Sequence, residues 1–297
     1  MSTALLFPGQ GSQHSGMGEQ RFDEFPELVA EADEILGQSF REICLDESHA
    51  EKLGQTQFTQ PALYLVSCLE TKSKLAEGCN PSFAAGHSVG EYAALHAAGS
   101  LSFADGLRIV AKRGEIMSKV SGGGMAAVIG MDPSKILEVI DEKGFAQVDM
   151  ANFNSPQQTV ISGPESDIES LEEPIKQAGA KLYVKLKVSG AFHSRMMKTP
   201  AEEFSKFLEG IKFEKPNIKV ISNVEAKPYE GDDGIPELLV SQIHSPVKWS
   251  ETIKYLRESG VSEFLECGPG KVLTKLLRQI PKPKKKNPQT TDCQTSR

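Results

Sequence analysis

Cysteine is scarce in this sequence, and its arrangement argues against two classes of protein. The 297 residues include five cysteines, at positions 44, 68, 79, 267 and 293, and no two of them form a CxxC pair. An odd number of scattered cysteines is not typical of a disulfide framework or of a zinc site. We therefore expect all five to be reduced and either structural or incidental, and we expect no metal site.

Long apolar runs are also missing. No stretch approaches the roughly 20 apolar residues that span a bilayer. Residues 1–7 are too short an apolar stretch for a signal peptide and have no basic leader. These absences predict a soluble, cytoplasmic protein that makes no membrane contact, with residues 4–7 as a first buried strand.

Basic residues are fewer than acidic ones, and several of the basic residues are concentrated at the C-terminal end. The formal net charge is −7; residues 281–297 hold four lysines and one arginine against one aspartate, or +4, which leaves −11 on residues 1–280. An acidic body argues against nucleic-acid binding, which depends on basic surfaces. Prolines and polar residues accompany the basic end, so we predict a disordered basic tail over residues 281–297.

Short apolar runs alternate with longer helical patterns in the first part of the chain, which predicts α/β layering around a parallel sheet. Ser102, with Asp105 three positions on, forms a capping-box pattern that opens one of the helices. The expected strands are residues 4–7 and 83–86, and the expected helices are residues 59–76, 89–98 and 103–119.

The rhythm changes between residues 123 and 191, where the order becomes βαββαβ, as in a ferredoxin-like unit. The expected strands there are residues 125–129, 146–152, 158–162 and 181–188, and the expected helices are residues 133–143 and 165–178. The chain then returns to the large sheet through expected strands 219–222 and 263–267, with helices over 249–259 and 271–279. We therefore predict a large domain of residues 1–122 and 192–280, and an inserted small domain of residues 123–191.

The sharpest motif is Gly-His-Ser-Val-Gly at residues 86–90, which follows an apolar strand and opens a helical stretch. A G-x-S-x-G sequence in that setting is typical of a nucleophile elbow, in which the serine is exposed on a tight turn. Ser88 is therefore the candidate nucleophile, and the Val89 amide is placed to stabilise an oxyanion at the helix N-terminus. We expect the neighbouring His87 to point away from it.

A serine nucleophile needs a base, and histidine is the usual one. Six histidines are candidates, at positions 14, 49, 87, 96, 193 and 244. His193 stands where the chain leaves the predicted small domain, and a cleft between domains is a common place for a substrate site. The residues alone do not choose among the six.

Several further motifs occur in a fixed order along the chain. Residues 7–13 read Phe-Pro-Gly-Gln-Gly-Ser-Gln, residues 86–92 Gly-His-Ser-Val-Gly-Glu-Tyr, residues 124–128 Gly-Met-Ala-Ala-Val, residues 152–156 Asn-Phe-Asn-Ser-Pro, and residues 268–270 Gly-Pro-Gly. Together they resemble the malonyl-CoA:acyl carrier protein transacylase family of fatty acid and polyketide synthesis, over nearly all of residues 3–280. The resemblance implies an α/β-hydrolase-like large domain with a ferredoxin-like insert.

The resemblance also implies roles for matching residues. Ser88 would be acylated, and His193 would be its general base. The backbone carbonyl of Gln242 would orient that histidine in place of an aspartate, and the amides of Gln10 and Val89 would form the oxyanion hole.

Two further residues would define the acyl group. Arg113, 25 residues after Ser88, stands where the family holds an arginine, and a guanidinium can bind a malonyl carboxylate through two parallel hydrogen bonds. Phe192 would fill the space that an α-methyl group needs. One methyl group is worth only about 1–3 kcal/mol of discrimination, so this preference would be partial.

The implied reaction is a ping-pong transfer of malonyl from malonyl-CoA, through Ser88, to the phosphopantetheine thiol of an acyl carrier protein. It needs no metal or redox cofactor, and we expect a monomer that serves polyketide or fatty acid synthesis. An acyl hydrolase of the same fold is the main alternative, although Arg113 argues against it because neutral acyl chains leave a buried cation unpaired. A non-catalytic scaffold is the third, and Ser88, His193 and Arg113 together argue against it.

Overall fold

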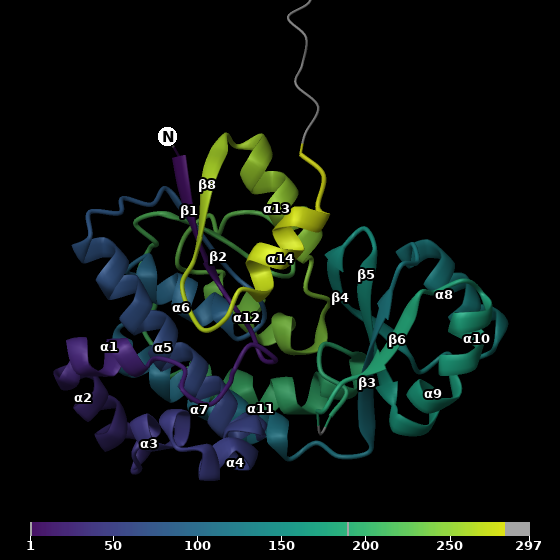
Figure 1. Cartoon of the computed structure of the whole chain (residues 1–297), viewed down its shortest axis with the longest axis horizontal. Helices are drawn as coiled ribbons and strands as arrows, with labels where there is room; N and C mark the ends of the chain where they lie inside the picture. The colour runs from purple at the N-terminus through teal and green to yellow at the C-terminus, as the bar shows by residue number, and fades with distance from the viewer. Residues whose placement is uncertain (1, 189, 283–297) are drawn as a thin grey trace, which may run out of the picture.

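The computed structural model describes residues 2–188 and 190–282, which fold around two four-stranded sheets (Figure 1). The first sheet has the order β7-β2-β1-β8, and each of its strand pairs is parallel. The second has the order β4-β5-β3-β6, and each of its strand pairs is antiparallel. The chain is therefore an α/β protein, as predicted.

The parallel sheet has buried side chains on both faces. Its strands are β1 (Ser2–Phe7), β2 (Phe83–Gly86), β7 (Lys219–Ile221) and β8 (Val261–Glu266). Side chains alternate along β1, so that Leu5 and Phe7 belong to one apolar core while Ala4 and Leu6 belong to another. A strand buried on both faces reads as a continuous apolar run, which is why residues 4–7 and 83–86 were recognisable as strands.

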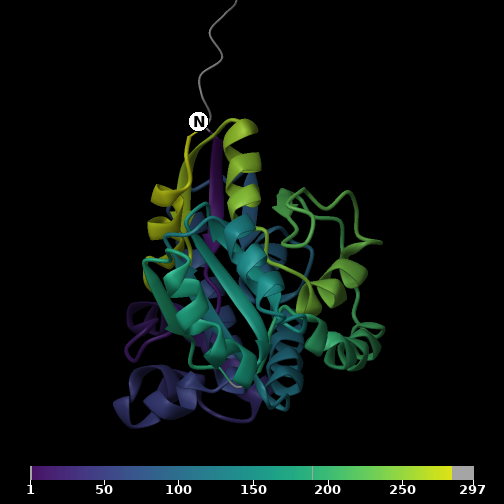
Figure 2. The same ribbon diagram turned by 90° about the vertical axis from the view of Figure 1, so that its right-hand side faces the viewer.

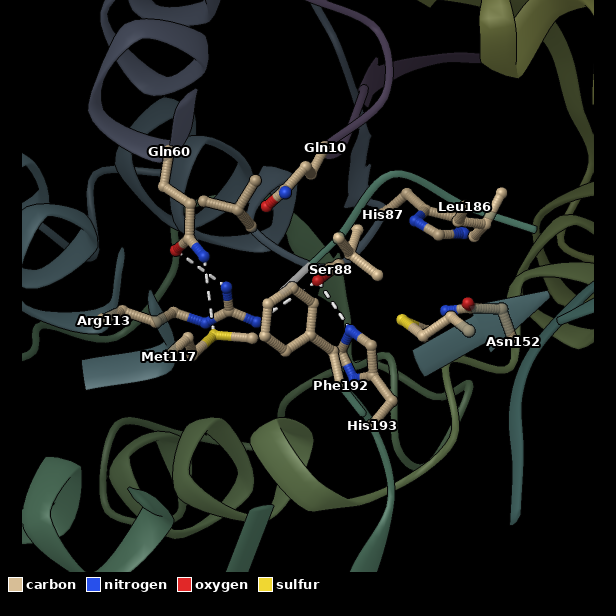
Figure 3. Close-up of a pocket in the computed structure, with 13 residues that line it drawn as sticks. Gln10, Gln60, His87, Ser88, Arg113, Met117, Asn152, Leu186, Phe192 and His193 are labelled. Atoms are coloured by element: carbon tan, nitrogen blue, oxygen red, sulfur yellow. Dashed lines mark hydrogen bonds between the residues drawn. The ribbon is translucent and has the colours of Figure 1, made fainter. Parts of the chain in front are cut away.

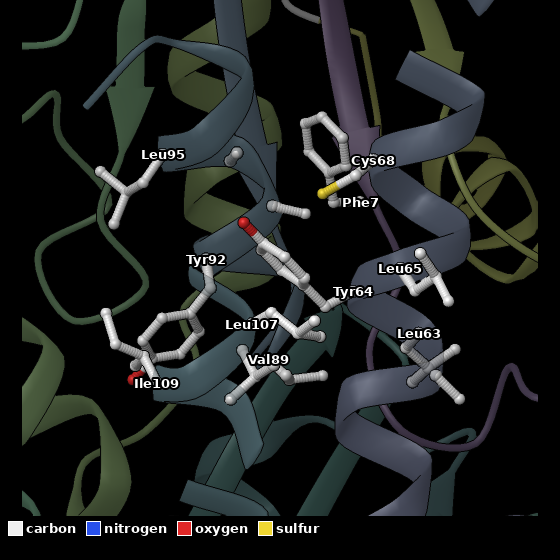
Figure 4. Close-up of a cluster of buried hydrophobic side chains, with 14 of the residues drawn as sticks. Phe7, Leu63, Tyr64, Leu65, Cys68, Val89, Tyr92, Leu95, Leu107 and Ile109 are labelled. Carbon is white, nitrogen blue, oxygen red and sulfur yellow. The ribbon is translucent and has the colours of Figure 1, made fainter. Parts of the chain in front are cut away.

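Helices cover both faces of the parallel sheet and contribute side chains to both apolar cores. The first face is covered by α5 (Thr56–Ala76), α6 (Gly90–Ala97) and α7 (Phe103–Ser118), whose side chains pack around Tyr64 and Tyr92 (Figure 4). The second face is covered by α13 (Trp249–Glu258) and α14 (Val272–Gln279), through side chains such as Trp249 and Leu273. As predicted, the Ser102 hydroxyl caps α7 by accepting a hydrogen bond from the Asp105 amide at 3.0 Å.

Helix α5 begins at Thr56, three residues earlier than the predicted start, and contains Pro61 within it. The sequence analysis made no prediction for several other helices, three of which have six residues or fewer. They are α1 (Glu19–Glu24), α2 (Pro26–Leu36), α3 (Phe40–Leu45), α4 (Ala50–Gly54), α11 (Lys198–Leu208) and α12 (Ile235–His244).

The antiparallel sheet lies in the teal part of the chain, with helices over its outer face (Figure 2). The element order is the predicted βαββαβ: β3 (Gly123–Ile129), α8 (Pro133–Glu142), β4 (Asp149–Ser155), β5 (Gln158–Pro164), α9 (Glu165–Ser170), α10 (Glu172–Gln177) and β6 (Leu182–Lys185). Buried residues of the sheet, such as Val128 and Ile161, pack against Ile140 and Leu171 from the helices.

Three predicted boundaries in this region were wrong. The strand predicted over residues 146–152 is β4 and runs from Asp149 to Ser155, because residues 145–148 form a turn closed by the Val148 amide on the Phe145 carbonyl at 3.0 Å. The helix predicted over 165–178 is divided into α9 and α10, where Pro174 has no N–H to donate to the Ser170 carbonyl. The strand predicted over 181–188 ends at Lys185.

The outer edge of β4 is paired with a segment that belongs to neither sheet. Asn152 of β4 forms a parallel bridge with Val247, which lies between α12 and α13. The Val247 amide donates to the Ala151 carbonyl, and the Phe153 amide donates to the Val247 carbonyl, each at 2.9 Å. This edge of the antiparallel sheet is therefore paired with the polypeptide that follows α12.

No helix within residues 2–188 and 190–282 has the length and apolar character needed to cross a membrane. The four cysteines that fall in these ranges (Cys44, Cys68, Cys79 and Cys267) are free thiols, as predicted. Cys293 and nearly all of the predicted tail over 281–297 lie outside the described residues.

Candidate active site

Ser88 occupies the turn between β2 and α6, in the left-handed backbone conformation with φ 51°. The flanking glycines make this turn possible. A Cβ on Gly86 would lie 1.9 Å from the Gly90 carbonyl carbon, and one on Gly90 would lie 2.2 Å from the Phe7 carbonyl oxygen. A non-glycine residue with positive φ is uncommon, and such strained positions concentrate at functional sites. The predicted nucleophile elbow is present.

The Ser88 hydroxyl is hydrogen-bonded to His193, with 2.8 Å between Oγ and Nε2 (Figure 3). The other ring nitrogen, Nδ1, lies 2.8 Å from the backbone oxygen of Gln242. A carbonyl oxygen can only accept, so Nδ1 carries the proton and Nε2 is left free to accept one from Ser88. The structure therefore brings together the serine, the histidine and the carbonyl that the sequence analysis singled out.

Arg113, on α7, reaches the same place from the opposite side (Figure 3). Its side chain is 1% exposed and donates to the side-chain oxygens of Gln60 at 2.8 Å and Gln242 at 2.9 Å. It also donates to Ser88 Oγ at 3.2 Å. Within the described part of the chain no carboxylate lies within 4.0 Å of its guanidinium, so a buried cation stands beside the serine without a directly paired anion.

A pocket opens over these groups. Its other lining residues include Gln10, Val89 and Phe192, which the sequence analysis assigned to the site. Gln10 is brought there by its neighbour Gly9, where a Cβ would lie 2.5 Å from the His87 carbonyl oxygen. Among residues 2–188 and 190–282, neither the Gln10 nor the Val89 amide donates a hydrogen bond to a protein group. Both N–H groups are therefore free to bind a ligand oxygen.

His87 also lines the pocket, but its imidazole is directed to other partners. Its Nε2 lies 2.8 Å from the Asn154 side-chain oxygen, and its ring packs against Trp249 with 5.6 Å between centroids. Burial lowers the pKa of His87. As expected, His87 is not the histidine that contacts the serine hydroxyl.

The electrostatics of the site favour a neutral base. Burial, and then the positive charge of Arg113, lower the pKa of His193 to about 3, against the opposing effect of the hydrogen bond to Gln242. His193 is therefore unprotonated at neutral pH and able to accept a proton. Burial also lowers the pKa of Arg113, although it stays far above neutrality because an arginine does not lose its charge in proteins.

Three residues that support the site were not identified from the sequence. Gln60 accepts a hydrogen bond from Arg113, and the Asn223 side chain accepts one from the Ser88 amide at 2.7 Å and donates one to the Gly86 carbonyl at 2.6 Å. Glu91 was quoted within the motif 86–92 but received no role, although it is buried beside Gln242. No local pattern identifies Gln60 or Asn223, because only the fold brings them to Ser88.

A serine on a strand-to-helix turn, hydrogen-bonded to a neutral histidine and facing two free amides, is the arrangement of an enzyme that transfers acyl groups through a serine ester. The chain belongs to the acyl transferase family, because residues 4–292 match the Acyl transferase domain. The resemblance noted from the sequence motifs is thereby confirmed.

Curated relatives agree with this assignment. The polyketide biosynthesis malonyl CoA-acyl carrier protein transacylase BaeC of Bacillus velezensis is 48% identical over 279 residues, covering 93% of this chain and 95% of that protein. The malonyl CoA-acyl carrier protein transacylase of Bacillus subtilis is 42% identical over 286 residues, covering 93% of this chain and 90% of that protein. The polyketide biosynthesis protein ThaF of Burkholderia thailandensis is 49% identical over 93% of this chain, which spans only 24% of its length.

Solved structures show the same fold. The crystal structure of malonyl CoA-acyl carrier protein transacylase from Burkholderia pseudomallei has a TM-score of 0.90 at 44% identity, covering 94% of this chain and 98% of that chain. A malonyl-transacylase solved in complex with its type II polyketide synthase acyl-carrier protein has a TM-score of 0.90 at 38% identity, covering 94% of this chain and 93% of that chain.

Proposed function

We propose that this enzyme transfers a malonyl group from malonyl-CoA to the phosphopantetheine thiol of an acyl carrier protein, through an ester on Ser88. One observation carries the choice of acyl group: the guanidinium of Arg113 is buried, has no directly paired carboxylate within the described residues, and lies 3.2 Å from the Ser88 hydroxyl. A buried cation is costly unless it is paired. The free carboxylate of a malonyl group supplies the missing anion.

The first half-reaction forms the acyl-enzyme. His193 Nε2 takes the Ser88 proton as Oγ attacks the thioester carbonyl, and the carbonyl oxygen becomes an oxyanion. The amides of Gln10 and Val89, which have no other acceptor in the described structure, stabilise that charge. The tetrahedral intermediate collapses with cleavage of the C–S bond, and the proton on His193 passes to the departing coenzyme A thiolate.

The second half-reaction reverses the roles. The phosphopantetheine thiol gives its proton to His193 and attacks the serine ester, so that the malonyl group leaves as a thioester of the carrier and Ser88 regains its proton. The Gln242 carbonyl holds the His193 ring in the same tautomer throughout. No step requires a metal or redox cofactor. The names of the relatives support polyketide or fatty acid synthesis as the setting.

Phe192 limits what can be attached to the malonyl group. Its ring lines the pocket beside Ser88, and Phe192 is buried. A branched α-carbon would therefore meet Phe192. The resulting discrimination against methylmalonyl is that of about one methyl group, or about 1–3 kcal/mol.

The sheet topology supports the two-domain description. We assign residues 1–122 and 192–280 to an α/β-hydrolase-like large domain and residues 123–191 to a ferredoxin-like small domain, because the second sheet has the βαββαβ order and is antiparallel. We also propose a monomeric, cytoplasmic enzyme. An acyl hydrolase is not favoured, since neutral acyl chains would leave Arg113 unpaired and the relatives are named transacylases.

The function is tested by following the acyl group. After brief incubation with malonyl-CoA, intact-protein mass spectrometry is expected to show one malonyl adduct on the protein. The adduct should persist in buffer and move to a phosphopantetheinylated acyl carrier protein when that is added, and not to the same carrier protein lacking the phosphopantetheine arm. An adduct that is lost to water at the same rate with or without the carrier would instead identify a hydrolase.

The lowered pKa of His193 predicts an unusual pH dependence. Because this pKa is about 3, the base stays unprotonated in mildly acidic solution. The rate of Ser88 acetylation by acetyl-CoA, whose acyl group carries no charge, should therefore change little between about pH 8 and about pH 5, whereas an ordinary histidine titrates near 6.5. Rapid-quench mass spectrometry measures the rate, and circular dichroism at each pH verifies that the protein is folded. A loss of rate with a midpoint near 6.5 would contradict the prediction.

A further inference from the structure

Glu91 is a buried carboxylate beside the site for which the mechanism above has no use. It lies in the first turn of α6, three residues after Ser88, and is 1% exposed. Its Oε1 accepts hydrogen bonds from the Tyr229 hydroxyl at 2.5 Å and the Asn223 amide at 3.1 Å. Its Oε2 accepts one from the side-chain nitrogen of Gln242. A buried carboxylate with three donors and no cation in direct contact needs a functional explanation.

The Gln242 side chain connects Glu91 to Arg113. Its Nε2 donates to Glu91 and to the Ser88 carbonyl, the latter at 3.1 Å, while its Oε1 accepts from Arg113 at 2.9 Å. An amide has a donor end and an acceptor end, whereas an ionised carboxylate only accepts. Glu91 and the Ser88 carbonyl, both acceptors, therefore hold the Gln242 amide in one orientation. With Nε2 turned to Glu91, the oxygen is the end that is presented to Arg113.

The charges of the two groups also act on each other across this amide. The pKa of Glu91 is raised to about 7, because burial outweighs the hydrogen bonds from Tyr229, Gln242 and Asn223 and the charge of Arg113, all of which lower it. Burial lowers the pKa of Arg113, while interactions with Tyr92 and Glu91 raise it. Glu91 is thus an indirect counter-ion for Arg113, at a distance that leaves the guanidinium free for a second anion.

We propose that Glu91 is a positioning residue for the acyl carboxylate: by orienting the Gln242 amide, it holds the Arg113 guanidinium where a malonyl carboxylate binds. This inference rests on the proposed function, because it concerns the same arginine. Glu91 itself touches neither the acyl group nor the reacting atoms. Its loss should therefore affect acyl groups that carry a carboxylate and spare those that do not.

The test is the variant Glu91→Gln. The glutamine keeps one side-chain oxygen and replaces the other with a nitrogen. The Asn223 N–H belongs to the backbone and cannot turn, so the oxygen stays with Asn223 and the nitrogen faces Gln242 Nε2. The Gln242 amide is the partner that can reverse, which places its own nitrogen against Arg113, donor against donor. We expect the rate of Ser88 malonylation to fall about tenfold or more, which corresponds to loss of about one hydrogen bond to a charged group. The rate of acetylation should change by less than about threefold, because Glu91 does not contact the acetyl group and acts on the site only indirectly.

A matched control is Glu266→Gln. Glu266 is a partly buried carboxylate that also accepts three hydrogen bonds, from the Leu273 amide at 2.9 Å, the Thr274 amide at 2.9 Å and the Thr274 hydroxyl at 2.6 Å. The Glu266→Gln variant makes the same chemical change away from the pocket, so it should alter neither the rate of malonylation nor that of acetylation. Glu91→Asp keeps the charge but withdraws the carboxylate. If Glu91→Gln does not fold, this variant should show a smaller selective loss of malonylation.

A double variant decides whether Glu91 acts through Arg113. If it does, Glu91→Gln should cause no further loss of malonylation when added to Arg113→Ala, because the effects of coupled residues are not additive. An equal fall in malonylation and acetylation, or full additivity in the double variant, would overturn the proposal. Failure of the wild-type enzyme to form any malonyl adduct would instead count against the proposed function, so the two failures are distinguishable.

Discussion

Replacement of Ser88 by alanine is expected to abolish the covalent malonyl adduct. The Ser88 hydroxyl is the group that lies 2.8 Å from His193 Nε2 on the strained turn, so the variant has no nucleophile at the place where the base and the two free amides converge. Removal of a serine nucleophile costs about 10⁶-fold in turnover in enzymes that depend on one. Intact-protein mass spectrometry after incubation with malonyl-CoA measures the adduct, and transfer to an acyl carrier protein measures turnover.

A suitable control is Ser100→Ala. Ser100 is buried, and its hydroxyl has no hydrogen-bond partner among the described residues, so its loss should leave the adduct unchanged. His193→Ala should keep the nucleophile but lose the base, which slows acylation between about 100- and 10,000-fold. A malonyl adduct of wild-type intensity on Ser88→Ala would show that another residue is acylated, and the mechanism would have to be abandoned.

Arg113→Ala is expected to remove the preference for malonyl over acetyl groups. The guanidinium offers the carboxylate charge-assisted hydrogen bonds that contribute about 1.5–3 kcal/mol each, so loss of two of them lowers the rate of malonylation by about 100-fold or more. Acetylation, which gains nothing from the cation, should be retained. The ratio of the two adducts, measured with malonyl-CoA and acetyl-CoA in competition, gives the change in preference directly.

Two further variants separate charge from geometry. Arg108→Ala removes an exposed arginine of the same helix, paired with Asp105 at 3.3 Å, and should leave the ratio unchanged. Arg113→Lys keeps the charge but cannot form two parallel hydrogen bonds, so malonylation should be only partly restored. If Arg113→Ala still prefers malonyl as strongly as the wild-type enzyme does, the carboxylate is bound elsewhere and the assignment of the acyl group is wrong.

The core of the fold was predictable because its signals are local. Residues 4–7 and 83–86 are apolar throughout, as strands buried on both faces are, and Ser102 marks the start of α7. β4 was misplaced because residues 149–155 include Asp, two Asn and Ser, which disfavour a strand. Pairing with β5 and with Val247 outweighs those preferences. Helices of six residues or fewer, such as α1 and α4, are stabilised mainly by packing and so have weak sequence signals.

The site residues also differ in how far local sequence predicts them. Ser88 was predictable from its own neighbours, since the glycines at 86 and 90 are needed within the turn itself. His193, Gln242 and Arg113 were assigned only through the resemblance to a family, and their geometry agrees with that assignment. The hydrogen bond from the Ser88 amide to Asn223 spans 135 positions of sequence, and no pattern within a short window encodes such a contact.

The pairing of Val247 with β4 has a consequence for protein engineering. An exposed edge strand offers unpaired N–H and C=O groups to any other chain, and natural proteins usually cover such edges. Here the edge is covered by the segment immediately after α12, and Gln242 lies in the last turn of α12 itself. In a chimera that exchanged only residues 123–191, a foreign edge would therefore meet a segment that does not match it. We expect such a chimera to aggregate more readily and to displace the carbonyl that orients His193. Grafts intended to alter acyl selectivity should carry residues 242–248 together with the small sheet.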